Sequence, residues 1–126
     1  MMKNIIKLFL AIAIIFMGLG SFAAGGFLNP NLDISEVRAS HILVKSRKEA
    51  VQIKKQIENG DITFEEAAYE YSLCPSKQYG GDLGYFNRKQ MVQQFADTAF
   101  DLKVGEISDP VGTKFGWHII KTTGKR

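Results

Sequence analysis

Two histidines and one cysteine are the residues of this 126-residue chain most able to take part in chemistry. His41 and His118 each lie in an apolar stretch typical of a β-strand, and Cys74 lies in a segment rich in Pro, Gly and Ser. Side chains alternate between the two faces of a strand, so His41 shares a face with Leu43 and His118 shares one with Ile120. A single buried histidine is usually a hydrogen-bonded core residue. Two of them, together with the sole cysteine, indicate a site that faces an interior or a cleft.

The cysteine count restricts the chemistry further. With Cys74 alone, the chain forms no internal disulfide and has no metal site built on two cysteines. The thiol is either buried packing, which is common for free cysteine, or a group with a role in a site. We expect neither a metal nor another cofactor.

The charge balance argues against polyanionic partners. The formal net charge is +3, but Lys3 and Lys7 belong to the N-terminal segment, and the remaining chain has 14 basic and 13 acidic residues. A surplus that small gives no electrostatic case for nucleic acid or for an anionic membrane surface. We therefore expect no nucleic-acid partner, and membrane contact only through the N-terminal segment.

The N-terminus has the order of a secretory signal. Residues 1–7 are basic, residues 8–19 are almost wholly apolar, and small residues follow at Ser21, Ala23 and Ala24. This predicts a signal peptide over residues 1–23, a linker over 24–34 and one domain over 35–126. The alternative is an uncleaved anchor, because residues 8–28 carry no charge and are long enough to span a bilayer. Either way, the domain is expected to be exported to the periplasm, cell envelope or exterior.

The domain is expected to be α+β with a mostly antiparallel sheet, because strands stand at both ends and helices between them. Helical spacing and stop signals predict helices over 47–59, 64–71 and 91–102. A loop is expected over 72–82. Apolar alternation predicts strands over 37–44, 83–87 and 117–123, with a further strand after the turn that begins at Gly105.

Six short motifs together resemble the parvulin family of peptidyl-prolyl cis/trans isomerases. They occur in family order and spacing across residues 37–125: His41-Ile-Leu-Val, Cys74-Pro-Ser, Gly80-Gly-Asp-Leu-Gly, Gln90-Met91 with Phe95, Gly105-Glu106 with Pro110-Val111, and Phe115-Gly-Trp-His118-Ile-Ile. The resemblance implies a four-stranded, mostly antiparallel sheet flanked by about four short helices. It also implies isomerisation of X–Pro bonds in exported polypeptides during folding, by a domain that acts as a monomer.

The resemblance also assigns roles residue by residue. His41 and His118 match the paired histidines at the centre of the sheet, and Cys74 matches the thiol that faces the substrate peptide bond. Thr113 matches the hydroxyl that hydrogen-bonds the histidine pair. The positions that hold the proline ring or line the cleft are matched by Leu83, Met91, Phe95 and Phe115.

Phosphate dependence is not expected. Family members that require a phosphate before the proline resemble one another in a longer basic loop after the first strand. In this chain the strand runs almost directly into a helix, with Lys45, Arg47 and Lys48 at the junction.

Other functions remain open at this stage. The main alternative is a non-catalytic chaperone module that binds peptides through the same fold. A thiol hydrolase that pairs Cys74 with a histidine is a second alternative. The segment after Cys74 begins with Pro75 and is not expected to form a helix that lowers the pKa of the thiol.

Overall fold

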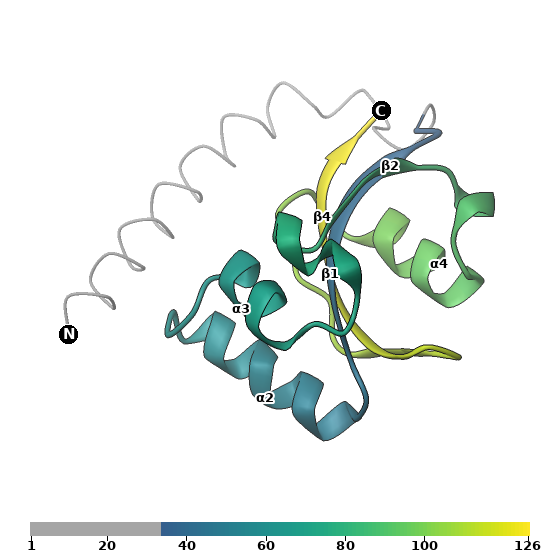
Figure 1. Ribbon diagram of the computed structural model, residues 1–126. Coiled ribbons are helices and arrows are strands. Elements are labelled where there is room, and N and C mark those ends of the chain that lie inside the picture. Colours follow the sequence, from purple (N-terminus) through teal and green to yellow (C-terminus); the bar gives the residue numbers. More distant parts are fainter. Residues whose placement is uncertain (1–33) are drawn as a thin grey trace, which may run out of the picture. The chain divides into compact units, whose positions relative to one another are not determined.

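The computed structural model describes residues 34–126 (Figure 1). The predicted signal peptide and the predicted linker up to residue 33 lie outside the described residues. Within residues 34–126, no helix is both long enough and apolar enough to cross a membrane.

The unit is built on a four-stranded antiparallel sheet of order β2-β1-β4-β3. Its strands are β1 (Val37–Val44), β2 (Asp82–Phe86), β3 (Val111–Thr113) and β4 (Gly116–Lys125). The central strands β1 and β4 pair along the whole of β1, with His41 opposite Ile120 and Leu43 opposite His118. The expected α+β architecture and antiparallel sheet are confirmed.

Helices α2 (Arg47–Glu58) and α3 (Phe64–Tyr71) cover one face of the sheet (Figure 1). Each begins at a hydroxyl cap: Ser46 accepts a hydrogen bond from the backbone N–H of Glu49, and Thr63 accepts one from that of Glu66. The core on this face is built from aliphatic residues of β1 and β4 and apolar residues of α2 and α3. Its members are Ile42, Val44, Ala50, Ile53, Phe64, Ala67, Ala68 and Ile119.

Helix α4 (Gln93–Asp101) covers the opposite face. Its buried residues Phe95 and Ala99 pack on the strand side chains that project to this face. The second core comprises Val37, Ala39, Phe86, Phe95, Ala99, Leu102 and Ile120. His41 and His118 are buried and project to this same face of the sheet. The expected sharing of one face by His41, Leu43, His118 and Ile120 follows from this alternation.

Two 3₁₀ helices were not expected as such: η1 (Pro75–Tyr79) and η2 (Arg88–Gln90). The segment after Cys74, expected to be a plain loop, is therefore one helical turn and a half. The helix expected from residue 91 starts at Gln93, because Met91 and Val92 have extended backbone dihedrals. With three α-helices and two 3₁₀ helices in residues 34–126, the expectation of about four short helices fits roughly.

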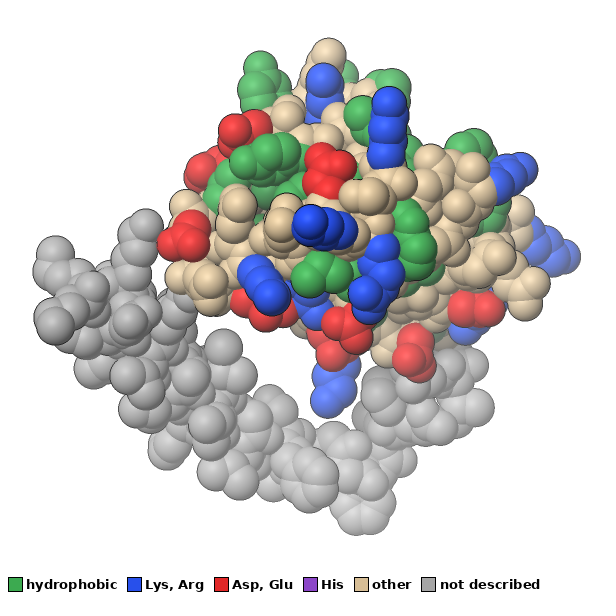
Figure 2. Space-filling model, turned by 90° about the horizontal axis from the view of Figure 1, so that it is seen from below, with side chains coloured by type: hydrophobic (Ala, Val, Ile, Leu, Met, Phe, Trp, Pro, Cys, Tyr) green, Lys and Arg blue, Asp and Glu red, His purple; other side chains and the backbone are tan. Residues whose placement is uncertain are grey.

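Charges of both signs are interspersed on the face of the domain shown in Figure 2. Lys and Arg side chains alternate there with Asp and Glu, and hydrophobic side chains gather in small groups between them. That face therefore presents no large area of one charge.

Candidate active site

A cavity of about 370 Å³ opens on the α4 face of the sheet. Seven of the eight predicted site residues line it: His41, Cys74, Leu83, Met91, Phe95, Phe115 and His118. The eighth, Thr113, is not among the lining residues but forms a hydrogen bond with His118. Residues that lie up to 77 positions apart in the chain thus meet at one place.

The two imidazoles stand side by side on the central strands. Their rings are stacked, with an interplanar angle of 18° and a centroid distance of 5.2 Å. Nδ1 of His41 lies 3.0 Å from Nδ1 of His118, and Nε2 of His118 lies 2.7 Å from Oγ1 of Thr113. The backbone N–H of Phe115 donates to the same hydroxyl at 3.2 Å. The β3–β4 hairpin thereby fixes the orientation of the His118 ring.

This geometry fits two neutral imidazoles with complementary tautomers. A hydrogen bond between two Nδ1 atoms needs one N–H and one lone pair, so two neutral rings carry their protons on different nitrogens. The chain of bonds runs from Thr113 through His118 to His41, or in reverse. Nε2 of His41 is shielded from solvent and has no hydrogen-bond partner among residues 34–126. Doubly protonated His41 would therefore place an unpartnered charged N–H in the interior.

The lowered pKa values of the two histidines indicate that both rings are neutral. Burial, and secondly the proximity of His118, lower the pKa of His41 to about 4. Burial lowers the pKa of His118 to about 4 as well. Both rings are therefore uncharged at neutral pH.

Hydrogen bonds from the two residues before Cys74 to β1 hold Cys74 at the cavity. The Leu73 N–H donates to the Leu43 carbonyl at 2.8 Å, while Oγ of Ser72 accepts from the N–H groups of Leu43 (3.1 Å) and Cys74 (3.3 Å). After η1 the chain returns to β1, where the His41 N–H donates to the carbonyl of Gly81 at 3.0 Å. Gly81 has φ 84°, and a side chain there would collide with the His41 carbonyl oxygen, so this position requires glycine.

The thiol forms no catalytic pair with an imidazole. Both ring nitrogens of His118 are engaged by His41 and Thr113, and the free Nε2 of His41 has no partner within residues 34–126. Cys74 is partly exposed and lines the cavity. The 3₁₀ turn that follows it has only five residues. Because Cys74 is not paired with either histidine, the site lacks the nucleophile–base pair of a thiol hydrolase.

Aromatic and aliphatic side chains form the rest of the wall. The Phe95 ring meets both imidazoles edge to face, at centroid distances of 5.4 Å to His41 and 5.3 Å to His118. Leu83 and Met91 are partly buried against the same core. Phe115, at the hairpin tip, is 61% exposed and stands at the cavity mouth. The result is an apolar hollow with a few polar groups, a form typical of ligand sites.

Three lining residues were not predicted: Leu43, Gln90 and Val92. Leu43 lies two residues after His41 in the same strand, so strand alternation identifies it as a candidate. Gln90, the last residue of η2, and Val92, the N-cap of α4, flank Met91, and neither position carries a sequence signal for a cavity wall. The Gln90 side chain is fixed by a hydrogen bond from the Asn87 N–H at 2.8 Å.

Comparison with known proteins identifies the family of this chain. Residues 38–124 match the family model of the PPIC-type PPIase domain, a rotamase. The foldase protein PrsA of Geobacillus kaustophilus is 50% identical over 91 residues, which is 71% of this chain and 32% of that protein. The chain thus spans about a third of the length of the curated relatives it matches.

Solved structures show the same fold. The crystal structure of PrsA from Bacillus subtilis superposes with a TM-score of 0.70 at 48% identity, covering 73% of this chain and 36% of that one. The solution structure of NmPin, the parvulin of Nitrosopumilus maritimus, gives a TM-score of 0.65 at 42% identity, covering 71% of this chain and 97% of that one. The chain therefore belongs to the parvulin family, as a PPIC-type peptidyl-prolyl isomerase domain.

Proposed function

We propose that residues 34–126 catalyse cis/trans isomerisation of X–Pro bonds in polypeptides and so assist protein folding. The observation that carries this proposal is one apolar cavity that joins a neutral histidine pair, a thiol and the side chains of Leu83, Met91 and Phe95. Membership of the parvulin family and the likeness to PrsA foldases support it.

The cavity suits the energetics of this reaction. Rotation about an X–Pro bond meets a barrier of about 18–20 kcal/mol because amide resonance resists twisting. No covalent bond has to break, so the enzyme need only bind the twisted amide better than the planar one. Leu83, Met91 and Phe95 hold the proline ring while the acyl side turns. Their low polarity favours the twisted amide, which is less dipolar than the planar form.

The polar groups set the electrostatics at the turning carbonyl. The neutral histidine pair holds Phe95 and the cavity floor in place without introducing a charge that would favour the dipolar planar amide. Thr113 acts as a positioning residue, because it contacts His118 and not the cavity. Cys74 faces the cavity, and we assign it a non-covalent role, because rotation needs no covalent intermediate.

Protease-free measurement of cis/trans exchange on a short Ala-Pro peptide tests this proposal. The wild-type domain should accelerate exchange at catalytic concentrations. Cys74→Ala should retain measurable activity, and Cys74→Asp should separate a polar role from a covalent one. If the folded wild-type domain leaves the exchange rate at its uncatalysed value, the isomerase proposal is wrong and the peptide-binding module takes its place.

We further propose that catalysis does not depend on a phosphate before the proline. Within residues 34–126 no Lys or Arg lines the cavity, and Lys114, the neighbour of Phe115 in sequence, lies over the Phe115 ring with Nζ 5.2 Å from the centroid. A phosphate would therefore find no buried cationic partner. Peptides with Leu-Pro and phosphoserine-Pro should give kcat/KM values within a few-fold. A hundredfold preference for phosphoserine-Pro would contradict this.

The cellular setting is also part of the proposal. The signal-like order of residues 1–23 supports export to the periplasm, cell envelope or exterior. We propose that the chain acts there as a monomer on unfolded polypeptides. Expression of the full chain in a secreting host, followed by mass measurement of the mature N-terminus, decides between cleavage after Ala23 and an uncleaved anchor. Sedimentation of the mature chain tests the monomeric state.

A further inference from the structure

Gln90 is the one polar residue of the cavity wall with no role in the proposed reaction. It is the last residue of η2 and lines the cavity beside Met91. Its carboxamide is bonded at one end, where Oε1 accepts from the Asn87 N–H at 2.8 Å. The NH2 group of the same amide has no hydrogen-bond partner within residues 34–126.

The capping box of η2 fixes which end of this amide faces which way. The Asn87 side chain accepts from the Lys89 N–H at 2.9 Å, and the Asn87 N–H donates to Gln90 in return. A backbone N–H can bond only the oxygen of a carboxamide, so Oε1 must face Asn87 and the NH2 group must take the other position. Gln90 therefore holds a free donor in a fixed orientation.

The other polar groups of the wall are engaged, shielded or weak. Both ring nitrogens of His118 are bonded, one to His41 and one to Thr113. Nδ1 of His41 bonds His118, and its Nε2 is shielded from solvent. The thiol of Cys74 is a weak donor. The rest of the wall consists of Leu, Met, Val and Phe side chains. Among the lining side chains of residues 34–126, Gln90 is thus the only strong donor left for a ligand.

A peptide bound in the cavity needs such a donor. An X–Pro segment brings two carbonyl groups to the wall, the one before the ring and the one after it. A carbonyl that leaves water without finding a new partner costs free energy. The carbonyl before the ring swings with the turning amide, whereas proline's own carbonyl is attached to the ring and stays with it. A donor held by a helix cap cannot follow the first, but it can keep one bond to the second in both isomers.

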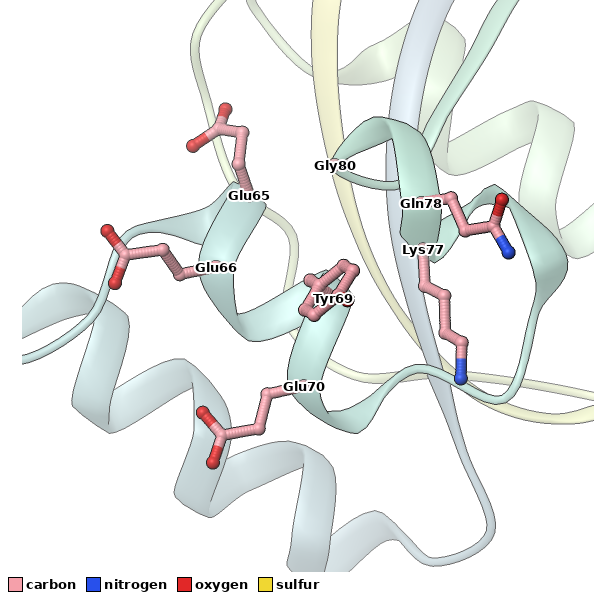
Figure 3. A pocket seen from close by; sticks show the side chains of 7 residues that line it. All are labelled: Glu65, Glu66, Tyr69, Glu70, Lys77, Gln78 and Gly80. Atoms are coloured by element: carbon pink, nitrogen blue, oxygen red, sulfur yellow. The ribbon is translucent and has the colours of Figure 1, made fainter.

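A larger hollow, of about 750 Å³, lies between α3 and η1 and has no comparable arrangement (Figure 3). The Glu66 and Glu70 side chains point away from η1, which carries Lys77 and Gln78, so the polar groups do not converge on one point (Figure 3). Within residues 34–126 no hydrogen bond fixes the Lys77 or the Gln78 side chain. The fixed amide of Gln90 therefore distinguishes the proline cavity from this hollow.

We propose that the NH2 group of Gln90 donates a hydrogen bond to the carbonyl group of the substrate proline and so positions the ring for rotation. Because this bond is the same in the planar and the twisted amide, it contributes to binding and not to transition-state stabilisation. Its loss therefore raises KM and leaves kcat unchanged. This inference rests on the proposed isomerase function for its role in catalysis, whereas the bond itself is testable by binding alone.

The test uses two substrates that differ at the proline carbonyl. Acetyl-Ala-Pro amide has this carbonyl, and in acetyl-Ala-2-methylpyrrolidide a methyl group takes the place of the carboxamide. Protease-free exchange measurements over a range of concentrations give kcat and KM for both. Gln90→Glu keeps an oxygen for the Asn87 N–H but has no donor at neutral pH. In this variant KM for the Pro amide should rise about fivefold, with kcat and the KM of the methylpyrrolidide within about twofold.

Two further variants separate the bond from charge and from capping. Gln93→Glu adds the same charge at an exposed position that does not line the cavity, so neither KM should change. Gln90→Met removes the donor without adding charge and should give the same selective rise in KM. An equal rise for both substrates in both Gln90 variants would show a purely structural role and overturn the proposal. A loss in kcat alone would assign the bond to the turning carbonyl and overturn it too.

Side-chain NMR separates failure of this proposal from failure of the isomerase proposal. In the ¹⁵N-labelled domain, the proton signals of the Gln90 NH2 group should move downfield as the Pro amide is added. They should stay in place with the methylpyrrolidide. Unmoved signals at millimolar Pro amide overturn the hydrogen bond, whether or not exchange is catalysed. If the signals move but exchange stays at its uncatalysed rate, the bond stands and the isomerase proposal is wrong.

Discussion

The two faces of the sheet are built from the same strands but serve different purposes. On the α2–α3 side, Ile42 and Ile119 project into a core of aliphatic residues, alanines and Phe64, with partly buried hydrophobic residues packed around it. On the α4 side, the alternate residues His41 and His118 project into a core that contains a hollow. One face therefore provides stability, and the other gives up part of its packing to hold a ligand.

The comparison teaches how a 93-residue unit supports a buried polar site. Burying two imidazoles costs free energy unless their nitrogens are bonded. Here three of the four ring nitrogens are bonded within the pair and to Thr113, and the fourth is His41 Nε2. The closed apolar face on the other side of the same strands offsets that cost.

The largest expected effect is on the closed face. Ile42→Ala removes a fully buried side chain and should lower the free energy of unfolding by about 3–5 kcal/mol. The folded variant should keep kcat/KM within twofold of the wild type, because Ile42 points away from the cavity. Urea denaturation and exchange kinetics below the transition check both. A tenfold loss of kcat/KM in the folded variant would contradict the separation of the faces.

The second prediction concerns acid and the open face. The pKa of each histidine is about 6.5 in the unfolded chain and about 4 in the folded one, so the unfolded chain binds more protons between these pH values. Stability is therefore complete above pH 6.5 and falls as the pH drops to 4, by about 3 kcal/mol for the first proton taken up by the coupled pair.

Urea denaturation at half-unit pH steps from 7 to 4 measures this loss. Below pH 4 the carboxyl groups of Asp82 and Asp109, whose pKa values are lowered by Arg38 and Lys54, add a separate loss. In His118→Gln, which removes one imidazole, the slope between pH 6.5 and 4 should become shallower. A wild-type stability that is flat over this interval would show that the histidines are not buried as neutral groups.

The third prediction contrasts two partly buried residues on opposite faces. Met91→Ala should lower kcat/KM at least tenfold, about 1.4 kcal/mol in transition-state binding, because it removes part of the wall that holds the ring. Ile57→Ala, a matched truncation against the α2–α3 core, should leave kcat/KM unchanged and lower only stability. Equal effects of the two variants on kcat/KM would remove the functional distinction between the faces.

The smallest expected effect is at Thr113. Thr113→Val removes the hydroxyl that bonds His118 and should lower kcat/KM about threefold and stability by about 1 kcal/mol. Thr123→Val is its control, because the Thr123 hydroxyl on β4 donates to the Arg38 carbonyl on β1, and neither residue lines the cavity. The pH dependence of stability should change in the first variant only.

The two faces also differ in how far sequence predicts them. Strand β1 was predicted with its observed bounds, and the two-residue period placed Ile42 and His41 on opposite sides. Helices α2 and α3 were predicted to within a residue, because their caps and apolar spacing are local signals. The α2–α3 face could therefore be predicted almost completely from the sequence.

The open face depends on geometry that has no local signal. The turn η1 was missed because a segment rich in Pro, Ser and Gly has no amphipathic period, and Met91 was placed in a helix although its backbone is extended. The bond between Thr113 and His118 crosses the β3–β4 hairpin, so only the family resemblance indicated it. Gln90 and Val92 were missed because they line the cavity from the end of η2 and the N-cap of α4, two positions that no sequence pattern marks.

The most direct test of the account is to find where a bound proline ring lies. Intermolecular NOEs should be measured between a short Ala-Pro peptide and the methyl-labelled domain while exchange is being catalysed. We predict NOEs from the proline ring protons to the Met91 methyl, the Leu83 methyls and the Phe95 ring. Catalysed exchange with NOEs to Ile57 and Ile62 on the α2–α3 face instead would contradict it.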